Sequence, residues 1–176
     1  MEPQPHPLVL AGMIAEPRTE RGRGTRHRLT ALGVDAADIV TAVGGLLCDR
    51  SLAGWYVTAH TAAENSTQPL RAVGAAPADL SALDFAPEAW PDVLVVSSRL
   101  FDRRDWVRRY VQVARRHNAA IGWWGQGGRT LPSRLQPVRY RPSRAALVFK
   151  ERAVRIAGAT ESESVESLLM REGFTL

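Results

Sequence analysis

Residues 91–98, P-D-V-L-V-V-S-S, decide the fold class of this chain. The apolar run is continuous rather than alternating, which is typical of a strand buried on both faces of a parallel sheet. Apolar residues then recur at helical spacing over 106–114, and A-A-I-G-W-W at 119–124 has the composition of another strand. Strand, helix and strand over 91–124 predict a right-handed parallel crossover.

The flanking sequence continues this alternation of strands and helices. Upstream, we expect a helix from Asp35 to about Gly54, strands at W-Y-V-T-A-H-T (55–61) and Q-P-L-R-A-V-G (68–74), and a helical turn opened by Pro77 and Asp79. Downstream, we expect a strand at Q-P-V-R-Y-R (136–141), a helix from Ser143 to Ala157, and a last helix from Thr160 to Gly173. The predicted fold is α/β, a three-layer Rossmann-like core with a mostly parallel sheet and two C-terminal helices.

The first 33 residues differ from the rest of the chain. They hold four prolines and the run R-T-E-R-G-R-G-T-R-H-R, without a stable periodicity, so we expect a disordered basic N-terminal arm over 1–33. Residues 34–176 are then expected to form a single α/β domain, a size that allows one ordinary core.

Composition narrows the classes of protein. One cysteine, Cys48, excludes an intramolecular disulfide framework, and the four dispersed histidines do not suggest a metal site. No stretch reaches the ~20 apolar residues of a membrane span. We therefore expect a cytoplasmic protein without a metal, a cofactor or a membrane partner.

Charge is strongly segregated along the chain. Residues 34–98 carry eight acidic residues against two Arg, a net charge of −6, whereas 99–155 carry fifteen basic residues against three acidic ones, a net charge of +12. Arginine abundance is also what a GC-rich genome produces, but codon use alone would not separate the acidic residues from the basic ones. The segregation favours contact with an acidic partner, either nucleic acid or protein.

The helix at about 103–117 provides the clearest cationic surface. Its arginines lie opposite the apolar side, and Arg129 extends the same basic region. The alternative is a solvated helix face, or one that pairs with the acidic half of the same domain. The candidate residues for binding an acidic partner are Arg104, Arg108, Arg109, Arg115, Arg116 and Arg129.

A second candidate site surrounds I-G-W-W-G-Q-G-G-R (121–129). Open α/β sheets bind ligands at the carboxyl ends of their strands, where this loop and the end of the 91–98 strand are expected. However, two prolines and no helical period follow the glycines, and neither G-x-G-x-x-G nor G-K-[ST] is present. A mobile surface loop at the rim of a crevice is the favoured interpretation. The candidate crevice residues are Ser97, Ser98, Trp123, Trp124, Gly125, Gln126 and Gly127.

No nucleophile, histidine and acid are found at catalytic spacing, and Ser97-Ser98 lacks a G-x-S-x-G elbow. The sequence therefore favours a non-enzymatic binding or regulatory protein that uses the basic surface of residues 99–155. The alternative is a small-molecule or nucleotide sensor, or an enzyme, that uses the crevice at the strand ends. Oligomerisation through the last predicted helix is a further option.

Overall fold

The computed structural model describes residues 26–63, 67–86, 89–126 and 128–171. Seven described strands form one sheet in the order β3-β2-β1-β4-β5-β7-β6. The strands are β1 (Arg28–Gly33), β2 (Tyr56–Thr61), β3 (Ala76–Asp79), β4 (Val93–Ser97), β5 (Ala120–Trp124), β6 (Leu135–Tyr140) and β7 (Glu166–Arg171). β1 to β5 pair in parallel, and β7 and β6 continue the sheet as antiparallel strands. The predicted α/β class with a mostly parallel sheet is confirmed.

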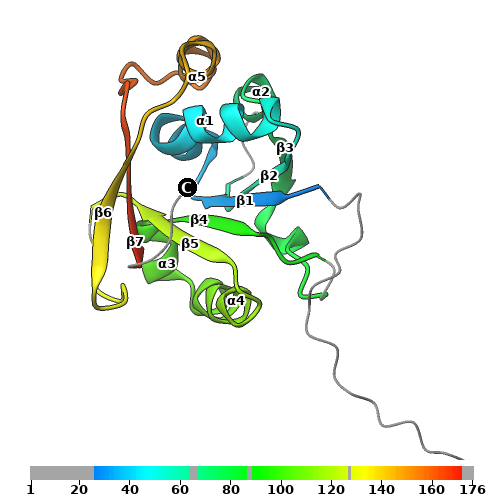
Figure 1. Ribbon diagram of the computed structural model, residues 1–176, viewed down its shortest axis with the longest axis vertical. Coiled ribbons are helices and arrows are strands. Elements are labelled where there is room, and N and C mark those ends of the chain that lie inside the picture. The colour runs from blue at the N-terminus through cyan, green and yellow to red at the C-terminus, as the bar shows by residue number, and fades with distance from the viewer. Residues whose placement is uncertain (1–25, 64–66, 87–88, 127, 172–176) are drawn as a thin grey trace, which may run out of the picture.

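Helices cover both faces of the sheet (Figure 1). On one face lie α1 (Ala36–Leu52), α2 (Gln68–Ala72) and α5 (Arg144–Ile156), and on the other lie α3 (Ser98–Arg103) and α4 (Asp105–Arg116). The short 3-10 helix η1 (Leu80–Ala82) belongs to the connection between β3 and β4. Two buried apolar clusters fill the spaces between these layers, one on each face.

The central unit folds as its apolar pattern predicts. All five residues of β4 and all five of β5 are buried, and their parallel register pairs Val93 with Ala120. On α4 the buried residues are Val107, Tyr110, Val111 and Ala114. The crossover places α3 and α4 on the face opposite α1, so the chain leaves β1 and β4 in opposite directions.

Four sequence-based assignments are wrong. Pro77, which was predicted to open a helical turn, lies in β3, and the turn η1 begins only after Asp79. The predicted arm over 1–33 includes β1, a central strand, while its first 25 residues lie outside the described residues. The predicted strand at 68–74 contains α2, because Pro69 occupies the first turn of a helix, where its missing N–H costs nothing. Only one of the two predicted C-terminal helices exists as a helix, α5. The second is replaced by β7, whose buried positions Glu166, Leu168 and Met170 alternate with period two.

Among the described residues, no helix is both long and apolar enough to span a membrane.

Candidate functional site

A pocket of about 520 Å³ opens at the carboxyl ends of β1, β4 and β5. β1 and β4 are neighbours in the sheet, but the helices that follow them lie on opposite faces, which makes this gap the point where open α/β sheets bind their ligands. The volume lies within the range of small-molecule sites. The lining residues are Asp35, Ala37, Asp38, Thr41, Ala42, Ser97, Arg99, Gly125 and Gln126.

Two carboxylates enter the pocket from the start of α1. Asp35 is the N-cap, and its Oδ1 accepts the Asp38 N–H at 2.8 Å, which satisfies one of the free N–H groups of the first turn. The Oδ2 atom of Asp35 has no hydrogen-bond partner in the described part of the chain. Asp35 thus keeps one oxygen available to a ligand.

Asp38 is held from two sides. Its Oδ2 accepts the Val34 N–H at 3.0 Å, and its Oδ1 accepts the indole N–H of Trp124 at 3.1 Å. The second bond joins α1 to the end of β5 across the pocket. Because both oxygens are engaged, Asp38 has a fixed orientation and contributes a negative charge at a defined place.

β4 and the start of α3 supply the opposite wall. Ser97 is buried at the end of β4, and Arg99 is exposed in the first turn of α3. No ion pair to Arg99 is found within the described ranges. The pocket therefore combines two carboxylates with a guanidinium that is not neutralised by a neighbouring acid.

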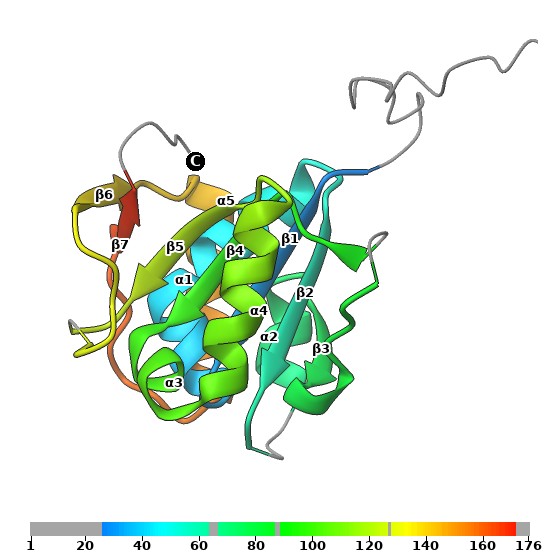
Figure 2. The same ribbon diagram turned by 90° about the horizontal axis from the view of Figure 1, so that it is seen from below.

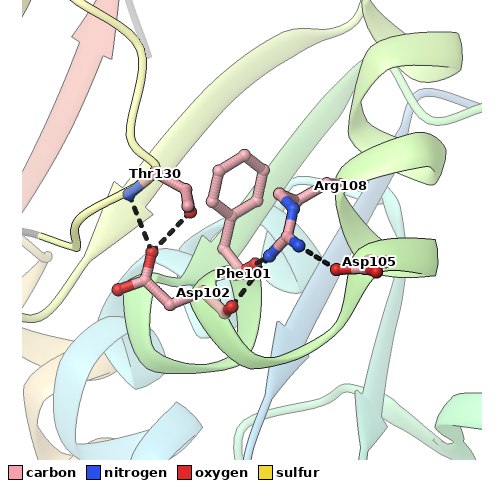
Figure 3. A network of polar contacts seen from close by, with 5 residues as sticks. All are labelled: Phe101, Asp102, Asp105, Arg108 and Thr130. Carbon is pink, nitrogen blue, oxygen red and sulfur yellow. Dashed lines mark hydrogen bonds and ion pairs between the residues drawn. The ribbon is translucent and has the colours of Figure 1, made fainter.

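The glycine-rich loop after β5 is tethered to α3 (Figure 3). The Ser98 hydroxyl donates to the Gln126 carbonyl at 3.0 Å. Asp102 accepts the N–H groups of Arg129 at 3.0 Å and Thr130 at 3.1 Å, and also the Thr130 hydroxyl. The Thr130 hydroxyl and these N–H groups hold the pKa of Asp102 below its usual value.

Gly128 is required by this arrangement. A Cβ at that position would lie 2.5 Å from Asp102 Oδ2, so a larger residue would separate the loop from the carboxylate. The described part of the predicted mobile loop is therefore attached to the scaffold by specific hydrogen bonds.

Only some of the predicted crevice residues line the pocket. Ser97, Gly125 and Gln126 do, whereas Ser98 is buried beneath the loop and Gly127 lies outside the described residues. Trp123 and Trp124 are both buried, in the apolar clusters on opposite faces of the sheet. Neither ring offers an exposed stacking surface, although Trp124 contributes indirectly through Asp38.

The predicted basic surface includes one residue with an internal role. Arg108 is half-buried and donates to the carbonyls of Phe101 and Asp102 at 2.8 Å each, and it also pairs with Asp105 (Figure 3). It therefore fixes the end of α3. The other five candidates are exposed: Arg104, Arg109, Arg115, Arg116 and Arg129.

Sequence reasoning missed the two carboxylates and Arg99 as site residues. Asp35 and Asp38 were correctly placed at a helix start, but with β1 unrecognised nothing indicated that this helix follows a central strand. Acidic residues directly after a buried strand are the signal that could have identified them.

No family model and no curated protein matches this chain. Among solved structures, it is similar to the deacetylase of the antimicrobial A40926 pseudoaglycone, with a TM-score of 0.59 and 15% identity over 83% of this chain and 97% of that one. A triple mutant of a deacetylase from the teicoplanin biosynthetic pathway gives a TM-score of 0.60 at 14% identity, over 81% of this chain and 97% of that one. The zinc-inhibited form of teicoplanin deacetylase gives 0.57 at 12% identity, over 84% of this chain and 100% of that one.

These similarities correct the functional prediction. The three similar structures named above are deacetylases, which contradicts the interpretation of the chain as a non-enzymatic regulatory protein that binds through its basic surface. At this level of identity the comparison establishes the α/β fold.

The described residues do not fit a zinc site. Catalytic zinc uses three protein ligands, and no group of three His, Cys, Asp or Glu side chains able to hold a metal is present in the described ranges. The pocket contributes only Asp35 and Asp38, and Asp38 already accepts two N–H groups.

Proposed function

We propose that this chain is a hydrolase that removes an acyl group from an amide nitrogen of a small substrate bound in the pocket at the ends of β1, β4 and β5. The observation that carries the proposal is the meeting of Asp35, Asp38 and Arg99 in a 520 Å³ pocket at this position. Two further facts support it: the fold is shared with deacetylases, and an acid and a cation in one pocket suit a reaction that develops a negative oxygen.

Asp35 is the general base in this proposal. Its free oxygen takes a proton from a water molecule as the water oxygen attacks the acyl carbonyl carbon. The carbon–nitrogen bond then breaks, and Asp35 returns the proton to the departing amine. The products are a carboxylic acid and a free amine, so no redox partner or co-reactant other than water is needed.

Arg99 and Asp38 have supporting roles. The Arg99 guanidinium stabilises the oxyanion that forms from the acyl carbonyl, since it has no competing carboxylate partner among the described residues. The Asp38 carboxylate, held in place by Trp124 and Val34, stabilises the positive charge that the amine acquires as it leaves. Ser97 adds a hydroxyl on the β4 wall.

The proposal is tested by measuring amine release. The full chain is incubated with a panel of N-acetylated amino sugars and N-acyl amino acids, and free amine is followed with fluorescamine. We expect the wild type to cleave at least one member, and Asp35→Asn to lose about 10²–10⁴-fold in rate. Glu161→Gln, which removes an exposed carboxylate outside the pocket, should leave the rate unchanged. Equal rates for wild type and Asp35→Asn would refute the assignment.

A further inference from the structure

A second cavity, of about 210 Å³, lies on the opposite side of β1 from α1 and is separate from the pocket described above. Its floor is the face of β1 and β2 that points away from α1. Its walls come from α4 and from the connection between β3 and β4. The lining residues are Arg28, Thr30, Tyr56, Thr58, His60, Ala82, Leu83, Asp84, Ala89 and Tyr110.

The floor is polar where a parallel sheet is normally apolar. In the register of β1 and β2, Arg28 lies opposite Tyr56 and Thr30 opposite Thr58, with His60 two residues further on. The alternate residues of the same strands are Leu29, Ala31, Val57 and Ala59, which belong to the core under α1. The polar side chains therefore occupy every floor position from Tyr56 to His60 on β2.

On this face of the sheet, α4 lies beside β2 and leaves β2 itself uncovered by an α-helix. Figure 2 views the sheet from the side of α4, and no α-helix lies in front of β2. The connection that crosses here contains only the three-residue helix η1 and irregular chain, with Leu80 and Trp90 buried against the sheet. A ligand can thus reach polar groups on the sheet surface itself.

His60 presents an acceptor to this cavity. Its Nδ1 lies 3.0 Å from the Asp79 carbonyl, which can only accept, so Nδ1 carries the proton. Burial lowers the pKa of His60, which keeps the ring neutral near pH 7 and leaves a lone pair on Nε2. His60 as a whole is only 8% exposed, and Nε2 has no hydrogen-bond partner in the part of the chain that the structure describes.

The other polar groups that line the cavity offer both hydrogen-bond donors and acceptors, and the opposite charges of Arg28 and Asp84 cancel. The hydroxyls of Thr30 and Thr58 share one hydrogen bond of 3.0 Å, which leaves one hydroxyl proton for another partner. Arg28 adds donors, and Asp84, whose Oδ1 accepts the Ala86 N–H at 2.8 Å, adds an acceptor through its other oxygen. Tyr56 supplies an exposed aromatic ring, with the Arg28 guanidinium 5.6 Å from its centroid, whereas the Tyr110 ring is buried against Trp90 and Phe85. A ligand that fits must both donate and accept hydrogen bonds, must be uncharged overall, and must be smaller than a drug-sized molecule.

We propose that this cavity binds one monosaccharide ring or a polyol of similar size. Hydroxyl groups of the ligand donate to His60 Nε2 and the Asp84 carboxylate and accept from Arg28, and the apolar face of the ligand ring packs against the exposed Tyr56 ring. This site is independent of the proposed hydrolase reaction, because it shares no lining residue with the first pocket.

Saturation-transfer NMR tests the proposal with D-glucose, D-galactose and D-mannose as separate probes, and with glycine and L-serine as zwitterionic comparison ligands. The wild type should transfer magnetisation to the ring protons of at least one hexose. Thr58→Val, which keeps the side-chain shape, and His60→Gln should each abolish that signal. Glu161→Gln, which alters an exposed residue outside both pockets, should retain it.

Two results would overturn the proposal. The first is the absence of a hexose signal with the wild type, whether or not an amino acid binds. The second is a hexose signal that both Thr58→Val and His60→Gln retain. Near-ultraviolet circular dichroism of each variant establishes that its tertiary packing is intact. Loss of hexose binding in Thr58→Val with a native spectrum therefore identifies the cavity. Failure of the hydrolase assay would not affect this outcome.

Discussion

Replacing Lys150 by methionine is expected to destabilise the fold severely, although Lys150 lies in neither pocket. Its Nζ is 2.9 Å from Glu166 Oε1, and both side chains are fully buried, between α5 and β7. Glu166 also accepts the N–H groups of Gly45 at 2.7 Å and Leu46 at 2.9 Å from α1. Burial raises the pKa of Glu166, and the Lys150 ammonium and these N–H groups oppose that rise.

The expected magnitude follows from this burial. Removing one partner of a buried ion pair leaves a desolvated charge and costs about 3–5 kcal/mol. For a chain of this length that corresponds to a decrease in Tm of roughly 6–20 °C. Lys150→Met and Glu166→Gln should each show a loss of this size. The double variant should be clearly more stable than the sum of the two losses predicts, because neither charge is then left alone.

Urea unfolding followed by tryptophan fluorescence measures these differences. Glu151→Gln and Arg152→Met are matched controls, since both side chains are exposed on the same helix, and each should change stability by no more than about 0.5 kcal/mol. If Lys150→Met costs less than about 1 kcal/mol, or if the two single losses simply add, the buried ion pair does not have this role in stability.

Three further predictions concern the loop, the cysteine and the histidine. Asp102→Asn should speed tryptic cleavage after Arg129, because the loop loses a carboxylate oxygen that accepts its N–H groups. The control variant Asp84→Asn should be cleaved at the wild-type rate. Equal digestion rates for the two variants would contradict the role of Asp102 in holding the loop. Burial raises the pKa of Cys48 to about 11, so Ellman's reagent should react with it at neutral pH far more slowly in the native protein than in urea. The folded-state pKa of His60 is lowered below 6.5, so the unfolded chain binds the proton first as pH falls. Stability should therefore decrease below about pH 6.5, and His60→Gln should reduce this slope in urea titrations at several pH values.

The sequence predicted correctly those strands and helices whose pattern of apolar residues is set by burial alone. β4, β5 and α4 carry apolar runs or helical periodicity, and they form as expected. β1 was missed because Thr30, at a floor position of the second cavity, interrupts its apolar character. A strand that serves a polar cavity does not resemble a core strand in sequence.

The end of the chain was misassigned for a tertiary reason. Thr160 and Glu163 match a capping box, and the acidic residues that follow suit a helix. The residues instead form β7, in which Glu166 is buried against Lys150 and the N–H groups of α1. The hydrogen bonds from Gly45 and Leu46 to Glu166 join residues about 120 positions apart along the chain, so no local sequence pattern reveals them.

The candidate site depends on strand order in the same way. Ser97 and the loop after β5 were identified because their strands are evident in sequence. Asp35 and Asp38 join them only because β1 lies beside β4. Arg99, one of fifteen basic residues over 99–155, becomes distinctive only when the pocket is known.

The initial rate of amine release by Asp35→Asn, relative to the wild type, reports directly on whether Asp35 is the general base. The wild type should cleave at least one N-acyl substrate, and the variant should retain about a hundredth of this rate or less. Its melting temperature should stay within a few degrees of the wild type, since only one capping bond is altered. If the variant folds normally and cleaves the same substrate at the wild-type rate, Asp35 is not the general base.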